Sequence, residues 1–353
     1  MKKYILCLLV ACGLVACGGG GSDSPATTPV TTPVTKTCAN GATDPNCVDA
    51  PAKLVTSVPV PPFTTGSEHL KAFNYFNNIR ASMGLGLLAY NTELENSAIN
   101  HAKYMDAHAV SGFGEDANLS GFTGADVISR AIYAGYRSLN NGGKDIFVGG
   151  GLATANTESG AIQALMNTIY HRSSLIGQGY TDVGSAWYCA TTVPAVSGCL
   201  NILVGGKTGA EQRNSFDFMS VYPIDGAKNV DLTAMNETVN PFPVDYPNGL
   251  IRGKVGYPVS FAIEESQRIV INSFTLTEQG KSTPLDAYLM TKATDPNNYI
   301  RQNEAYLTSK TILNPSIVYV AVVDATGITK AGTEHRYKKT WTFTTADRIL
   351  PSF

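Results

Sequence analysis

The sequence carries no excess of charge of either sign. Its 353 residues include 26 lysines and arginines against 28 aspartates and glutamates, a formal net charge of −2, with no obvious blocks of like charge. A basic patch is typical of nucleic-acid-binding proteins, and a polybasic run is typical of chains that bind anionic membrane surfaces. The composition therefore predicts no nucleic-acid partner and no electrostatic attachment to a membrane.

Several widespread catalytic motifs are also missing. The chain has no Gly-x-Ser-x-Gly nucleophile elbow, no phosphate-binding glycine loop followed by Lys-Ser/Thr, and no His-Glu-x-x-His pair. Gly149-Gly150-Gly151 lacks the flanking strand and helix of a phosphate loop, and Ser173 next to His171 along the chain does not make a triad. We therefore assign no catalytic residues from the sequence.

No apolar run is long enough to span a bilayer. The run Tyr4–Val15 follows Lys2 and Lys3 and falls short of the roughly 30 Å that a spanning helix needs, which is typical of a secretory signal. It ends in Leu-Val-Ala-Cys17 and four glycines, a pattern that resembles the bacterial lipobox. We predict a lipoprotein signal peptide over residues 1–16 and lipidation of Cys17. The alternatives are lipidation of Cys12, which leaves a very short apolar run, and ordinary signal cleavage beside an incidental cysteine.

A lipidated Cys17 would make the membrane a partner of the protein. Each buried CH₂ of an acyl chain contributes ~0.8 kcal/mol, so more than one chain makes a durable anchor. Gly18, rather than Asp, follows the cysteine, and by resemblance to the sorting rules of Gram-negative bacteria this indicates the outer membrane. Residues 17–62 are rich in Thr, Pro, Gly and Ser, and we expect them to form a flexible tether.

Cysteine spacing agrees with an exported chain. Of the seven cysteines, two leave with the signal and one takes lipid, so 7 − 3 = 4 remain. They form two close pairs, which predicts two disulfides, Cys38–Cys47 and Cys189–Cys199. A four-cysteine metal site is the alternative, although the spacing does not match C-x₂-C pairs.

The rest of the chain is long enough for two domains. Prolines cluster among polar residues near the middle, so we expect a linker over 223–252 between a first domain (63–222) and a second (253–353). In the second, alternating apolar residues and the run Ile317–Val323 predict short antiparallel strands, with hairpin turns at Glu278–Gly280 and Ala325–Gly327. These strands resemble bacterial Ig-like β-sandwich domains.

Helical spacing dominates the first domain. Ser67 is a candidate N-cap for one helix, and Asn91 or Thr92 begins another, in which His101 and His108 share a stripe with apolar residues. We expect His101 to be a buried, hydrogen-bonded core residue. Around Ala161–Tyr188, apolar residues at three- and four-residue spacing predict a helix that ends near His171 and is followed by a strand over Val183–Tyr188.

Together these motifs resemble the CAP (SCP-like) superfamily of cysteine-rich secretory, antigen 5 and pathogenesis-related proteins. The resemblance covers roughly residues 67–222 and rests on these segments: Asn78-Ile79-Arg80, Gly84-Leu85, His101-Ala102, Gly121–Gly124, Ala134–Tyr136, Leu165–Asn167, Tyr170–Arg172 and Val183-Gly184. It implies an α+β protein in which a CAP α-β-α sandwich precedes the all-β Ig-like sandwich. It also implies a cavity where two histidines and one or two glutamates bind a divalent metal, often zinc.

The cavity is only partly carried over. His171 and Glu115 match the family pattern, whereas Phe113 stands where similar proteins have histidine, and Lys144-Asp145 replaces a Gly-Glu-Asn pattern. His108 and Asp145 are candidate substitutes. Because a zinc site needs three or four ligands, we expect no metal or other cofactor, with His171 and Glu115 as ligands if zinc binds. We hypothesise that Lys144 supplies the missing positive charge by pairing with Glu115 over Phe113; a solvated Lys144 is the alternative.

Three classes of function stay open. The first is an exported, lipid-anchored binding or adhesion protein of the cell envelope, with a lipid, a glycan or a protein as ligand. The second is a metal-assisted hydrolase, in which Glu115 and His171 would act as acid and base. The third is a structural cell-envelope protein. We favour the binding protein.

Overall fold

The structure is a computed structural model, and it describes residues 52–110, 112–137, 147–151, 157–189, 199–206, 212–237, 239–242 and 250–351. The predictions made for Cys17, Cys38, Cys47, Lys144 and Asp145 lie outside these ranges. The helices are α1 (Glu68–Ser82), α2 (Thr92–His108), α3 (Val127–Tyr133), α4 (Glu158–Met166) and α5 (Tyr170–Leu175). None of these helices combines the length and the apolar character of a membrane-spanning segment.

Side-chain caps fix where the first two helices begin. Ser67 accepts a hydrogen bond from the backbone N–H of Leu70, and Asn91 accepts one from Leu94, so both predicted starts are confirmed. Such caps satisfy backbone donors that have no partner inside the helix. The predicted helix before His171 is instead two helices, because Asn167 ends α4 and the chain turns before α5 begins at Tyr170.

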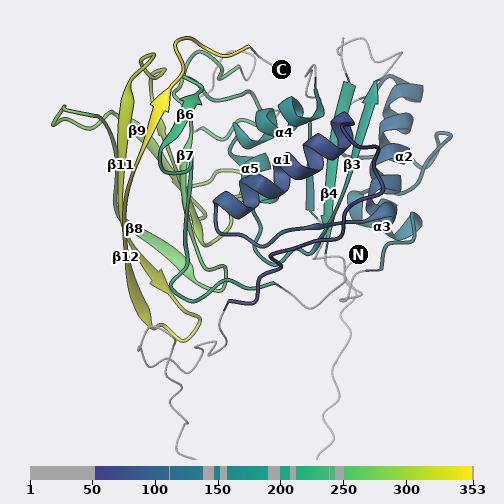
Figure 1. Cartoon of the computed structure of the whole chain (residues 1–353), viewed down its shortest axis with the longest axis horizontal. Helices are drawn as coiled ribbons and strands as arrows, with labels where there is room; N and C mark the ends of the chain where they lie inside the picture. The colour runs from purple at the N-terminus through teal and green to yellow at the C-terminus, as the bar shows by residue number, and fades with distance from the viewer. Residues whose placement is uncertain are drawn as a thin grey trace, which may run out of the picture. The chain divides into compact units, whose positions relative to one another are not determined.

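The first sheet forms the middle layer of an α-β-α sandwich. Its strand order is β1-β3-β4-β2, with β1 parallel to β3 and the other pairs antiparallel; the strands are β1 (Ala89–Tyr90), β2 (Phe147–Gly151), β3 (Asp182–Cys189) and β4 (Cys199–Gly206). Helix α2 covers one face, while α1 and α4 lie on the other (Figure 1). A Cβ at Gly184 would lie 2.1 Å from the backbone nitrogen of Glu95, so only glycine lets β3 approach α2 this closely.

Two further four-stranded sheets make up the all-β C-terminal part. One has the order β5-β7-β10-β9, with β5 (Met219–Tyr222), β7 (Val259–Ile263), β9 (Ala287–Thr291) and β10 (Glu304–Ser309). The other has the order β6-β12-β11-β8, with β6 (Ala227–Val230), β8 (Arg268–Glu278), β11 (Val318–Ile328) and β12 (Glu334–Thr345). Strand β6, from the expected linker 223–252, pairs in parallel with β12.

One predicted hairpin turn is wrong. Ala325–Gly327 lies inside β11, and the chain reverses later, where the N–H of Thr329 donates to the carbonyl of Thr333. Gly327 is needed for packing rather than for turning, because a Cβ there would lie 2.7 Å from the ring of Tyr337.

A continuous hydrophobic core joins the helical part to the strands that follow it. It includes Phe76 of α1, Ile162 of α4 and Phe261 of β7, each at most 1 % exposed. Arg172 of α5 crosses the same boundary, since its Nη1 donates to the carbonyl of Pro258 at 2.7 Å. All the described residues accordingly belong to one compact unit.

Candidate functional site

Glu115 lies in a buried polar cluster with His101. Its Oε1 is 2.9 Å from Nδ1 of His101, and its Oε2 accepts hydrogen bonds from the N–H groups of Thr123 and Gly124. The guanidinium of Arg130 lies 3.8 Å away and also donates to the carbonyl of Phe113. Burial and the nearby Arg130 lower the pKa of His101. The prediction that His101 is a hydrogen-bonded core residue is consistent with its 2 % exposure.

His171 lies in a different cluster, against the segment that follows the CAP-like part. Its Nδ1 is 3.0 Å from Oε1 of Glu237 and 3.0 Å from the hydroxyl of Thr168. Glu237 also accepts hydrogen bonds from the backbone N–H groups of Ile169, Tyr170 and His171. This carboxylate therefore caps the start of α5, which has no side-chain cap of its own.

The other described candidates do not join these two clusters into one cavity. Phe113 is 53 % exposed, and Nε2 of His108 is 2.7 Å from the carbonyl of Ser120. Within the described ranges, no group of three His, Cys, Asp or Glu side chains is arranged to hold a metal ion. His171 and Glu115, each bonded to a different partner, do not fit a shared zinc site.

A third polar cluster, around His69, was missed by the sequence reasoning. The two ring nitrogens of His69 lie 2.8 Å from Glu95 and 2.8 Å from Glu158, and Glu158 also accepts a hydrogen bond from Ser185. Because both ring nitrogens face carboxylates, both must carry protons, and the ring is an imidazolium. The glutamates lie 26 and 89 residues from His69 along the chain, so no local motif could reveal the cluster.

The charge state of this cluster follows from a balance of two effects. Burial on its own lowers the pKa of His69, but the hydrogen bonds with Glu158 and Glu95 outweigh it and raise the pKa to about 9. The ring of Phe63 packs edge-on against His69 at 4.2 Å between centroids. His69 is thus held as a cation between two carboxylates at neutral pH.

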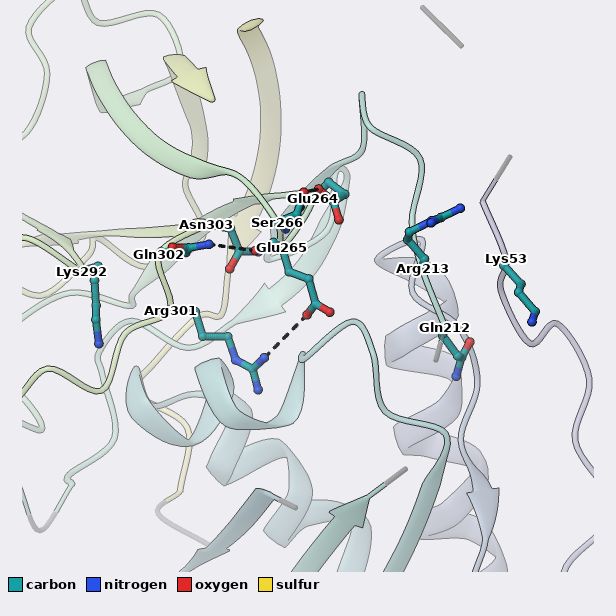
Figure 2. Close-up of a pocket in the computed structure, with 10 residues that line it drawn as sticks. All are labelled: Lys53, Gln212, Arg213, Glu264, Glu265, Ser266, Lys292, Arg301, Gln302 and Asn303. Carbon is teal, nitrogen blue, oxygen red and sulfur yellow. Dashed lines mark hydrogen bonds and ion pairs between the residues drawn. The ribbon is translucent and has the colours of Figure 1, made fainter. Parts of the chain in front are cut away.

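A polar cleft of about 830 Å³ lies in the described part of the chain. Every residue that lines it is polar, and the lining comes from segments far apart in the chain: Lys53, Gln212, Arg213, Glu264, Glu265, Ser266, Lys292, Arg301, Gln302 and Asn303 (Figure 2). The volume lies within the range that ligand sites occupy in proteins. This cleft, rather than the expected zinc cavity, is the candidate site.

Most charged side chains of the cleft have a hydrogen-bond or ion-pair partner. Arg301 lies 3.8 Å from Glu265, and the ammonium of Lys292 donates to the carbonyl of Asn298 at 2.7 Å. Glu264 accepts hydrogen bonds from the N–H and the hydroxyl of Ser266; burial raises the pKa of its carboxyl group despite these bonds. The remaining cations of the lining are Lys53 and Arg213, and the charge of Arg213 favours the ionised form of Glu264.

The strand register places Cys189 directly opposite Cys199 in the antiparallel pair β3–β4. The predicted Cys189–Cys199 disulfide requires this proximity. The bridge itself, like the pairing of Cys38 with Cys47, remains a prediction.

The helices packed on both faces of the first sheet, followed by all-β sheets, define an α+β protein with an α-β-α sandwich at its start. Residues 73–200 match the sequence model of the CAP family, described as the cysteine-rich secretory protein family. Residues 73–200 thus form a CAP-family region of the chain, as the sequence motifs predicted. The Ig-like character of the C-terminal part remains a prediction, although its sheets are consistent with a sandwich.

Solved structures show weak similarity to the chain. An extracellular protein containing an SCP domain from Bacillus anthracis str. Ames is 17 % identical, with a TM-score of 0.30, over 42 % of this chain and 45 % of that one. The match therefore spans less than half of the Bacillus protein. The copper resistance protein PcoC from Escherichia coli is 13 % identical over 36 % of this chain and 95 % of its own, with a TM-score of 0.21. CopC from Methylosinus trichosporium OB3b is 13 % identical over 36 % and 89 %, with a TM-score of 0.20. No curated protein matches the sequence.

Proposed function

We propose that this CAP-domain protein is exported, anchored by a lipid at Cys17 to the outer membrane of a Gram-negative bacterium, and binds a ligand at the cell envelope through the polar cleft. The signal-like N-terminus, the lipobox resemblance and the tether-like composition of residues 17–62 support export and anchoring. The cleft of about 830 Å³ is the observation that carries the binding role.

The chemistry of the lining favours binding over catalysis. Its one hydroxyl, on Ser266, donates to Glu264, and no histidine lines the cleft to activate it as a nucleophile. The two family-matched residues are also engaged elsewhere, His171 with Glu237 and Glu115 with His101. The charged and amide groups of the lining can orient a polar ligand without transforming it.

The binding role is tested by filling the cleft. Gln302 lines it and is exposed, so a Gln302→Trp substitution introduces an indole ring there, while Gln279→Trp places the same ring on an exposed turn outside the lining. The full chain is passed over peptidoglycan sacculi, polygalacturonate, dextran and poly-L-glutamate, each immobilised. We expect retention on at least one probe, lost in Gln302→Trp and kept in Gln279→Trp. No retention, or equal retention by both variants, overturns the proposal.

A further inference from the structure

Lys53 and Arg213 lie opposite each other in the backbone pairing at one wall of the cleft. They form an isolated antiparallel bridge, in which the N–H of Lys53 donates to the carbonyl of Arg213 at 2.8 Å and the N–H of Arg213 donates back at 3.0 Å. Side chains of directly opposite residues in such a pair lie on the same side, about 5 Å apart at Cβ, and like charges there are destabilising. Figure 2 shows both side chains at the same side of the cleft, with their charged ends pointing in different directions.

Neither cation has a close ion-pair partner within the described part of the chain. The charge of Arg213 does act on the carboxyl group of Glu264 across the cleft, but Nε of Arg213 is buried without a hydrogen-bond partner. The lining arginine at the other side differs, since Arg301 has Glu265 and Glu304 at 3.8 Å. A buried guanidinium nitrogen without an acceptor is costly, so the free protein keeps an unfavourable arrangement that an anion would relieve.

We propose that the Lys53–Arg213 pair is an anion clamp and that the ligand of the cleft is an acidic polysaccharide, bound through a sugar carboxylate. The inference rests on the proposed binding function and names its ligand class. A carboxylate placed between the two side chains would accept charge-assisted hydrogen bonds from the guanidinium and from the ammonium. These bonds would convert a repulsive pair into an attractive set of three charges.

The rest of the lining favours a polyhydroxylated ligand over a lipid. No aliphatic or aromatic side chain lines this cleft, and its carbon surface comes from the stems of polar and charged side chains, whose end groups would have to lose water beside a lipid chain. Sugar hydroxyls both donate and accept, as do the amide of Gln302 and the hydroxyl of Ser266. The buried Oδ1 of Asn303, another lining residue, has no hydrogen-bond donor in the described structure.

The ligand class is tested with three immobilised probes: polygalacturonate, neutral dextran and poly-L-glutamate. The proteins compared are the full-length wild type, Arg213→Gln, Lys53→Gln and the control Lys281→Gln, which changes a residue on an exposed turn. We expect the wild type to bind polygalacturonate at least about tenfold more tightly than dextran, and each clamp variant to lose about tenfold or more while Lys281→Gln does not. Raising the salt from about 0.05 M to about 0.5 M should weaken the binding, since exposed charges are screened.

Thermal unfolding separates an anion clamp from a structural role. Without ligand, Lys53→Gln should melt at the same or a higher temperature than the wild type, because a like-charge contact is removed. Polygalacturonate should raise the melting temperature of the wild type but not of the variant. A Lys53→Gln protein that melts lower without ligand and still binds polygalacturonate overturns the clamp.

The remaining outcomes distinguish the two proposals. Cleft-dependent binding of dextran as tight as that of polygalacturonate overturns the clamp and leaves the proposed function standing. Equal retention on poly-L-glutamate overturns the assignment to a polysaccharide. Retention on none of the probes overturns both proposals.

Discussion

At the scale of single residues, His69 predicts a specific dependence of stability on pH. Its pKa is raised from 6.5 to about 9 in the folded protein, so folding stabilises the protonated ring. The resulting stability is fully present below pH 6.5 and is lost as the pH rises through about 9. Glu95 and Glu158 are the carboxylates that face the ring, and the hydrogen bonds with His69 and Tyr90 lower the pKa of Glu95 despite its burial.

We expect the free energy of unfolding to fall by about 1–3 kcal/mol between pH 6.5 and pH 9.5, and the fall to be absent in His69→Gln. Urea unfolding at a series of pH values measures it. His335→Gln, which removes a histidine that packs against Phe216 and Tyr337, is the matched control and should keep the wild-type slope. A slope that survives in His69→Gln would show that another group carries it.

The residues also show where sequence reasoning reaches its limit. The capping roles of Ser67 and Asn91 can be predicted from the sequence because a capping side chain acts on a backbone group only three residues away. The hydrogen-bond partner of His171 cannot be predicted in this way, because Glu237 lies 66 residues further along the chain and only the fold brings it next to His171. Family motifs marked His171 and Glu115 as candidates, but they gave no sign that each has its own buried partner.

At the scale of elements, Glu237 should be essential for α5. This short helix starts without a side-chain cap, and its first N–H groups are satisfied by a buried carboxylate from the chain that follows β6. Removing the carboxylate in Glu237→Ala leaves those donors unsatisfied, at a cost of about 2–3 kcal/mol in unfolding free energy. Amide hydrogen exchange at Ile169, Tyr170 and His171 should quicken more than elsewhere.

Glu68→Gln is the control for this prediction. Glu68 also lies in the first turn of a helix, but its side chain is 44 % exposed and pairs only with Lys71 among the described residues. Its loss should therefore change the unfolding free energy by less than about 0.5 kcal/mol. Equal effects of the two substitutions would contradict a capping role for Glu237.

The elements themselves were largely predictable where their signals are local. Caps and apolar periodicity marked α1, α2 and α4, and the β-rich run marked β11. The break between α4 and α5 and the course of β11 through Gly327 were missed, because both depend on packing against distant residues. A glycine in a strand signals a turn only when no neighbouring side chain needs its space, and the ring of Tyr337 does.

At the scale of the whole molecule, Cys17 decides whether the protein stays on a membrane. Palmitate fed to cells that produce the full chain should label the wild type, and the protein should sediment with membranes. In Cys17→Ser both the label and the sedimentation should be lost, since the acyl chains supply the anchoring energy. Cys12→Ser is the control and should keep both, because we expect that residue to leave with the signal; loss of label in that variant would move the lipid site to Cys12.

The strongest test at this scale is removal of everything after Tyr222. The CAP-like helices bury Phe76 and Ile162 in a core that includes Phe261 of the later strands. Arg172 is fully buried, and its Nη1 would lose its acceptor on Pro258. A chain ending at Tyr222 would therefore expose a buried cation and an apolar face at once, each worth several kcal/mol of the 5–15 kcal/mol that typically holds a protein folded.

We expect the full chain to melt in one cooperative step and the truncated chain to bind a hydrophobic dye and melt without a sharp transition. Two separate transitions in the full chain, the first reproduced by the truncated one, would instead show that the CAP part folds independently and that its contacts with the strands are dispensable.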